Sequence, residues 1–203
     1  MTLQDRAAAY ASAFPKFPAS HLRVVREAGG DVLYGTWLIG NDYRNASSFY
    51  GSYPPGYLAR VHALFPDVES IDTVQGRLTT LHVFSGSLPA GPYVRCDVRQ
   101  PAECPCSVYD LQPGRDGSYD LLLADPPYSA ADAVHYATGM VDRRRAIAAL
   151  ARVARVGAHL VWLDTVWPMH RKAEWRTVGR INLIRSTNHR VRLVSIFERS
   201  HAA

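Results

Sequence analysis

The segment Leu121-Leu-Leu-Ala124, followed at once by Asp125-Pro126-Pro127-Tyr128, constrains the fold of this chain more than any other. Four consecutive apolar residues are typical of a strand that is buried on both faces, as in a parallel sheet. The two prolines end the strand because they lack the N–H group that the sheet needs. The sequence therefore predicts an α/β fold with a carboxylate and an aromatic ring at the carboxyl end of a central strand, where open α/β sheets bind ligands.

The residue types of this loop indicate its chemistry. Each proline fixes φ near about −65°, so the Asp125 carboxylate and the Pro126 carbonyl become two acceptors with little freedom. Two fixed acceptors match the two protons of a planar exocyclic amine, and Tyr128 offers a ring face on which a base can stack. A base inside a duplex must first be flipped out to reach such a loop. The alternative is a plain strand stop with a solvated carboxylate.

An Asp-Pro-Pro-Tyr loop after a hydrophobic strand resembles the catalytic motif of S-adenosylmethionine-dependent amino-methyltransferases, which methylate adenine N6 or cytosine N4 in DNA. Similar loops occur in RNA methyltransferases that act on exocyclic amines. The resemblance covers roughly residues 49–198. It implies a class I methyltransferase fold, which is Rossmann-like: an α/β fold with about seven mostly parallel strands, a final antiparallel hairpin and helices on both faces. It implies S-adenosylmethionine as cofactor and, as catalytic residues, Asp125, Pro126, Pro127 and Tyr128.

The same resemblance implies a series of cofactor contacts in chain order. Residues 49–56 and a helix expected over 57–65 match the motif that contacts the methionine end of the cofactor. A strand and turn over 81–87 match the first cofactor motif, except that Leu88 stands where the family has a second glycine. Strands are also expected over 93–98 and over 107–111. By the resemblance, Asp97 in the first suits the ribose hydroxyls of the cofactor, and Asp110 in the second faces the adenine amine of the cofactor. The implied cofactor-binding residues are Tyr50, Gly51, Phe84, Ser85, Gly86, Ser87, Asp97, Asp110 and Asp125.

Basic residues are concentrated toward the end of the chain. Residues 1–141 hold 10 Lys/Arg against 14 Asp/Glu, whereas residues 142–199 hold 13 against 4. Nearly all of these late basic residues are arginines, which suit bidentate phosphate contacts, so the pattern favours a polyanionic partner over a merely solvated basic face. The expected nucleic-acid-binding residues are Arg143, Arg144, Arg145, Arg171, Lys172 and Arg176.

Length and composition predict one compact unit. With 203 residues, 47% of them hydrophobic, the chain can bury a sizeable core. Residues 1–48 are expected to form an N-terminal extension of helix and loop with a strand or hairpin over 31–40, and residues 49–203 the catalytic domain. A closing β-hairpin is expected around residues 186–190. No signal peptide or long apolar run is evident, so a cytoplasmic location without membrane contact is the expectation.

The three cysteines predict neither a disulfide framework nor a metal site. Their number is odd, and Cys104-Pro-Cys106 has no second pair or spaced histidines to complete a ligand set. We therefore expect no metal.

The expected activity is methyl transfer to a nucleobase amine, with adenine N6 in DNA as the favoured target and an RNA base amine as the alternative. A separate target-recognition region is missing, since 38 residues separate Gly86 from Asp125. Recognition of the target sequence must then come from the N-terminal extension, the loop over 167–176 or a partner protein, or be minimal. A further alternative is a catalytically silent subunit that binds nucleic acid beside an active partner.

Overall fold

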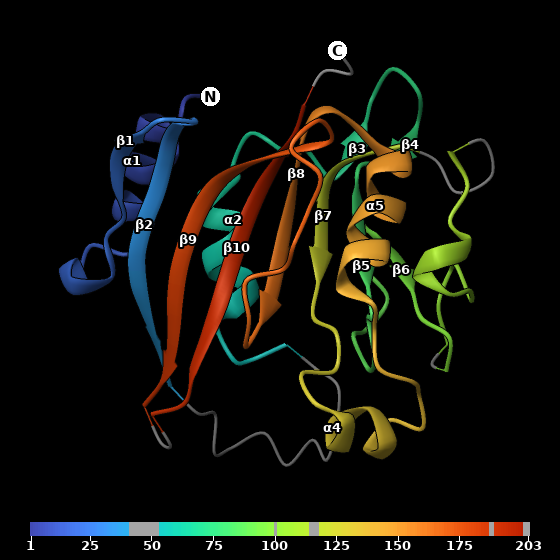
Figure 1. The fold of residues 1–203 in the computed structure, drawn as a ribbon. Coiled ribbons are helices and arrows are strands. Elements are labelled where there is room, and N and C mark those ends of the chain that lie inside the picture. The colour runs from blue at the N-terminus through green and yellow to red at the C-terminus, as the bar shows by residue number, and fades with distance from the viewer. Residues whose placement is uncertain (41–52, 100, 114–117, 187–188, 201–203) are drawn as a thin grey trace.

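The structure, a computed structural model, describes residues 1–40, 53–99, 101–113, 118–186 and 189–200. Within these residues eight strands form one sheet in the order β1-β2-β9-β10-β8-β7-β5-β6 (Figure 1). Its strands are β1 (Arg23–Glu27), β2 (Gly30–Ile39), β5 (Thr80–Val83), β6 (Val94–Cys96), β7 (Tyr119–Ala124), β8 (Ala154–Asp164), β9 (Trp175–Arg185) and β10 (Val191–Arg199). The short strands β3 (Ile71–Asp72) and β4 (Arg77–Leu78) pair with each other.

The sheet is mostly parallel. Strands β6, β5, β7 and β8 run in parallel, and β2 pairs with β9 in parallel. Strand β10 is antiparallel to both neighbours, β8 and β9, so the closing hairpin predicted from the sequence is confirmed. The chain is thus a mixed α/β protein whose large sheet is compatible with a Rossmann-like arrangement.

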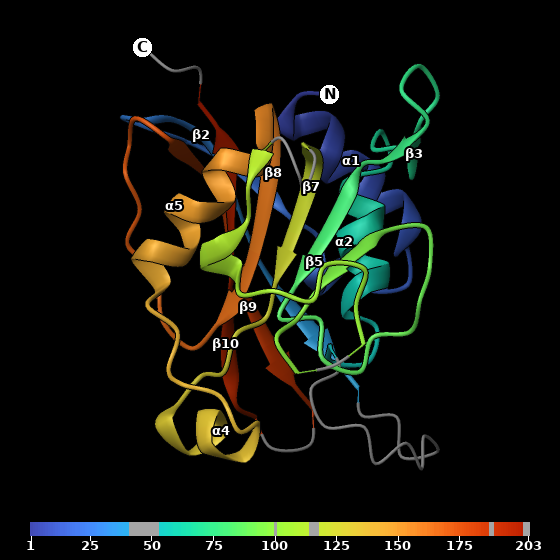
Figure 2. The same cartoon turned by 90° about the vertical axis from the view of Figure 1, so that its right-hand side faces the viewer.

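Helices cover both faces of the sheet, as Figure 2 shows with α1 and α2 on one side and α5 on the other. The described helices are α1 (Leu3–Ala13), α2 (Tyr57–Leu64), α4 (Ala130–His135) and α5 (Arg143–Val153), with 3₁₀ turns at Pro18–Ser20 and Val108–Asp110. Strand β7 confirms the prediction of burial on both faces: Leu121 and Leu123 pack in the cluster with α1 and α2, while Leu122 and Ala124 pack in the cluster with α5.

The N-terminal segment contributes strands to the same sheet. The helix expected in the N-terminal extension is present as α1. Thr2 caps its first turn, because the Thr2 side chain accepts a hydrogen bond from the Asp5 N–H. Strand β2 matches the strand expected over 31–40, and β1 is an additional edge strand that forms a hairpin with it. Tyr10 and Trp37 stack with ring centroids 5.6 Å apart inside the core beneath α1 and α2.

The strand expected over 107–111 is wrong. The chain forms a 3₁₀ turn over Val108–Asp110, which Ser107 begins by accepting from the Tyr109 N–H. Val108 and Leu111 lie three positions apart, so this turn buries both against α5, whereas an extended strand would point them to opposite faces. The sheet consequently ends at β6 on this side.

The parallel strands place their carboxyl ends at one edge of the sheet. The chain leaves β5, β6, β7 and β8 at this edge, and the turn between β9 and β10 reaches the same edge, because Leu193 pairs with Asp164. Helix α4 also lies there, at the lower end of Figure 1. No described helix is long and apolar enough to cross a membrane.

Candidate active site

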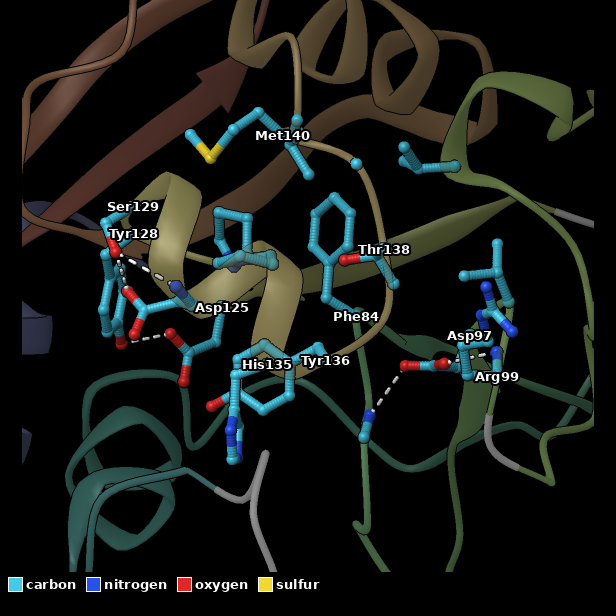
Figure 3. Close-up of a pocket in the computed structure, with 18 of the residues that line it drawn as sticks. Phe84, Asp97, Arg99, Asp125, Tyr128, Ser129, His135, Tyr136, Thr138 and Met140 are labelled. Atoms are coloured by element: carbon cyan, nitrogen blue, oxygen red, sulfur yellow. Dashed lines mark hydrogen bonds between the residues drawn. The ribbon is translucent and has the colours of Figure 1, made fainter.

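A cavity of ≈1240 Å³ opens at the carboxyl edge of the sheet. Its lining comes from the ends of β5, β6 and β7, from the segment that contains α4, and from the start of β10. Figure 3 shows Asp125 and Tyr128 on one side, Asp97 and Arg99 on the other, and Phe84 between them. This volume exceeds that of a typical small-molecule pocket, about 300–1,000 Å³, so the cavity has room for more than one small ligand.

The Asp125–Tyr128 loop forms one wall of this cavity directly after β7. The Tyr128 hydroxyl donates a hydrogen bond to Asp125 Oδ1, which occupies one carboxylate oxygen. The Arg192 guanidinium lies over the Tyr128 ring, 4.6 Å from its centroid. A base that stacks on Tyr128 must therefore use the opposite ring face or displace Arg192.

The environment of Asp125 changes its acidity. Burial raises the pKa of this carboxyl from 3.8 to about 7, since a carboxylate loses solvation among the surrounding groups. The Tyr128 hydrogen bond and the positive charge of Arg192 oppose the rise in pKa, and the negative charge of Asp164 adds to it. A carboxyl group that titrates near neutral pH is a feature of functional sites rather than of solvated turns.

Asp164, at the end of β8, is linked to the Asp125–Tyr128 loop through Arg143. Asp164 is fully buried and accepts from Arg143 Nε at 2.6 Å, from Trp162 Nε1 at 3.0 Å and from the Thr165 N–H at 2.7 Å. Arg143 also donates to the Tyr128 carbonyl oxygen at 3.3 Å. The first turn of α5, the end of β8 and the Asp125–Tyr128 loop are thereby tied together.

The opposite wall is built around Asp97 after β6. Its Oδ2 accepts from the Gly86 N–H at 2.9 Å and its Oδ1 from the Arg99 N–H at 2.8 Å. These two bonds fix the Asp97 carboxylate between the turn after β5 and the end of β6. Gly86 has φ +52°, a left-handed conformation in which glycine avoids a steric penalty.

Backbone strain is concentrated around the cavity. The described non-glycine residues with positive φ are Phe84 (55°), Ala137 (51°) and His189 (50°). Phe84 and Ala137 line the cavity, and His189 precedes the lining residue Arg190. Such conformations cost roughly 1–3 kcal/mol each and persist where the surroundings enforce them, commonly at ligand sites.

Three buried hydroxyl groups behind the cavity lining have no hydrogen-bond partner among the described residues: those of Tyr57, Ser85 and Ser87. Ser85 and Ser87 flank Gly86, which lines the cavity. The pKa of Tyr57 is raised, mainly by burial and to a smaller extent by the negative charge of Asp125. The second cause indicates that the two side chains are near each other. Buried polar groups are nearly always satisfied, so these hydroxyls suit a polar ligand.

The structure brings together most of the residues that the sequence analysis assigned to a site. The Asp125–Tyr128 loop, Phe84, Gly86 and Asp97 all line the cavity. Ser85, Ser87 and Asp110 do not line it: the two serines flank Gly86, and Asp110 is exposed in the 3₁₀ turn. Tyr50 and Gly51 lie outside the described residues.

The expected nucleic-acid-binding residues do not form one surface. Arg143 is engaged with buried Asp164, and Arg145 lies over the Tyr109 ring, 4.8 Å from its centroid. Arg144 is exposed beside them in the first turn of α5. Arg171, Lys172 and Arg176 lie at the far, amino edge of the sheet, because Trp175 pairs with Arg199 at the end of β10.

Other arginines line the cavity instead, and sequence reasoning did not assign them to the site. They are Arg99, Arg190 and Arg192. In the sequence, Arg190 and Arg192 alternate with apolar residues, a pattern typical of a strand with one solvated face. Their position beside Asp125 depends on the pairing of β10 with β8, which local sequence does not reveal.

In comparisons with known proteins, no protein-family model, no curated protein and no solved structure matches this chain.

Proposed function

We propose that this protein transfers a methyl group from S-adenosylmethionine to an exocyclic amine of a nucleobase, with adenine N6 in DNA as the favoured target. The observation that carries the proposal is the position of the Asp125–Tyr128 loop. It follows the central strand β7 and lines the large cavity, and the pKa of Asp125 is raised to about 7. The order of β7, β8 and the antiparallel β10 is also compatible with a class I methyltransferase sheet.

The residues present fit the proposed cofactor. S-Adenosylmethionine supplies a methyl group on a sulfonium, which is a good leaving group. Asp97 lines the cavity just after β6, where an acidic side chain suits ribose hydroxyls, and Phe84 offers an apolar surface between the two walls.

Asp125 and the Pro126 carbonyl bind and orient the target amine. Asp125 Oδ1 already accepts from Tyr128, so Oδ2 is the oxygen assigned to the amine N–H. Two acceptors on the amine protons direct the nitrogen lone pair away from them, toward the methyl donor. Positive charge develops on the nitrogen as it attacks, and the Asp125 carboxylate stabilises that charge. Because its pKa is near 7, Asp125 can also hold the released proton at Oδ2 before the proton passes to water.

The decisive experiment measures transfer of labelled methyl groups from S-adenosylmethionine to double-stranded DNA, total RNA and a protein mixture. We expect labelling of DNA and loss of at least about 100-fold in rate for Asp125→Asn, since an amide donates where a carboxylate accepts. The matched control is Asp132→Asn, on α4 in the same cavity lining. Labelling of RNA alone would change the substrate and leave the reaction class standing. No binding of S-adenosylmethionine by calorimetry would reject the proposal.

A further inference from the structure

The three cysteines of the chain converge at the end of β6, although they are spread along the sequence. Their sulfur atoms all lie within 4.8 Å of one another, and Cys104 Sγ is 3.3 Å from Cys106 Sγ. No disulfide joins them. Cys96 is 1% exposed, and the other two are partly exposed. Three thiols from two chain segments therefore meet at one point beside the cavity.

The backbone holds this arrangement in place. The Cys104 N–H donates to the Arg95 carbonyl at 2.9 Å, so the returning loop lies alongside the end of β6. Glu103 accepts from the Arg95 N–H at 2.9 Å, and its carboxylate pairs with the Arg95 guanidinium at 2.7 Å. The thiols are thus brought together by a paired loop with its own ion pair.

We propose that Cys96, Cys104 and Cys106 bind one Zn²⁺ ion. Thiolates are the preferred soft ligands of zinc, and Zn–S bonds of about 2.3 Å in a tetrahedron separate the sulfurs by about 3.8 Å. The observed separations, 3.3 Å for one pair and at most 4.8 Å for all, bracket that value. On binding, the zinc ion replaces the thiol protons, which pass to solvent.

The fourth zinc ligand comes from the cavity side. Cys96 and Cys106 line the cavity, so a water molecule or a group of a bound ligand can reach the ion there. The ion would tie the loop at Cys104–Cys106 to the strand end that carries Asp97 and Arg99. Its role in this arrangement is to fix the Asp97 wall, and the site does not depend on the proposed methyl transfer.

The test uses the full chain, purified with any affinity tag removed, and measures metal content by native mass spectrometry and elemental analysis. We expect about one zinc per chain. We expect Cys104→Ser and Cys106→Ser to lose most of it, while the control Val98→Ser, at an exposed position in the same region, retains it. Substitution of zinc by Co²⁺ in the wild-type chain should give sulfur-to-cobalt charge-transfer absorption, which also reports on the site if a cysteine variant fails to fold.

Two results would overturn the proposal. One is a metal-free chain whose thiols react with a thiol reagent at the same rate with and without added Zn²⁺. The other is a mass lower by two hydrogens that marks a disulfide between Cys104 and Cys106, which would make the cluster a redox site instead. Neither result depends on methyl transfer, so the two proposals fail separately.

Discussion

Asp125 combines a structural cost with a chemical use. Asp125 follows directly after the apolar strand β7, where burial disfavours the charged carboxylate and raises its pKa to about 7. Tyr128 and Arg192 partly offset that effect, so the charge of Asp125 can be switched within the physiological pH range.

The rate of methyl transfer should depend on the ionisation of Asp125. Protonated Asp125 cannot accept from the amine, so we expect kcat/KM to fall about tenfold per pH unit below pH 7 and to level off above it. Tyr128→Phe removes the hydrogen bond that lowers the pKa of Asp125, and should move the inflection to higher pH. Rates measured from about pH 5 to about pH 9 test this, and an inflection unmoved by Tyr128→Phe would contradict the assignment.

Asp125→Asn should stabilise the fold while it removes activity. The folded chain holds the Asp125 proton more tightly than the unfolded chain, whose aspartates have a pKa near 3.9, so ionisation costs folding free energy. This cost is absent below about pH 4, grows as the pH rises, and is complete above about pH 7. We therefore expect Asp125→Asn to melt at least about 4 °C higher than the wild type at pH 8, with no difference at pH 4. Calorimetry at both values tests the sign.

At the scale of elements, one ion pair connects α5, β8 and the Asp125–Tyr128 loop. Arg143 begins α5, pairs with the fully buried Asp164 and reaches the Tyr128 carbonyl. Removal of the guanidinium leaves a buried carboxylate with only neutral donors. A cost of 3–5 kcal/mol is typical of a fully buried pair; because Arg143 keeps 22% of its side chain exposed, we expect about 2–3 kcal/mol.

Urea unfolding of Arg143→Met tests this expectation. The matched control is Arg144→Met, which removes an exposed guanidinium from the same turn of α5 and should change the free energy of unfolding by no more than about 0.5 kcal/mol. Equal stabilities at neutral pH would mean that Arg143 has no structural role.

Local pattern predicted the elements that were long or strongly apolar. β7, α1, α2 and the β9–β10 hairpin follow from apolar runs, helical spacing and turn residues. The segment over 107–111 forms a 3₁₀ turn and not a strand. Its five residues are too few to show whether the apolar positions follow a strand or a helical period. The ion pair of Arg143 was not predictable in this way because its partner Asp164 lies 21 residues away.

The candidate site was predictable where its residues lie in short motifs or directly after apolar strands. The Asp125–Tyr128 loop, Phe84, Gly86 and Asp97 line the cavity as the sequence indicated. The cysteine cluster depends on a loop that returns to β6, and the placement of Arg192 depends on the pairing of β10. These are tertiary contacts between distant segments, which propensity and motif spacing do not encode.

At the scale of the whole molecule, the basic residues divide between the two edges of the sheet. Arg99, Arg190 and Arg192 lie at the cavity edge, and Arg171 and Arg176 at the opposite edge. If the substrate is a nucleic acid whose base enters the cavity, its phosphates must lie along Arg99, Arg190 and Arg192. Only part of the basic charge in the second half of the sequence therefore faces the cavity.

Arg190→Gln should consequently weaken nucleic-acid binding, and Arg171→Gln should not. Both remove one exposed guanidinium, so the global charge changes equally, but only Arg190 lines the cavity. Each lost phosphate contact lowers the slope of log K against log salt by about one unit, so we expect that change for Arg190→Gln alone. Fluorescence anisotropy with a labelled duplex over a range of salt concentrations measures it. Equal slopes for the two variants would mean that binding follows net charge, and that the nucleic acid does not lie along the cavity edge.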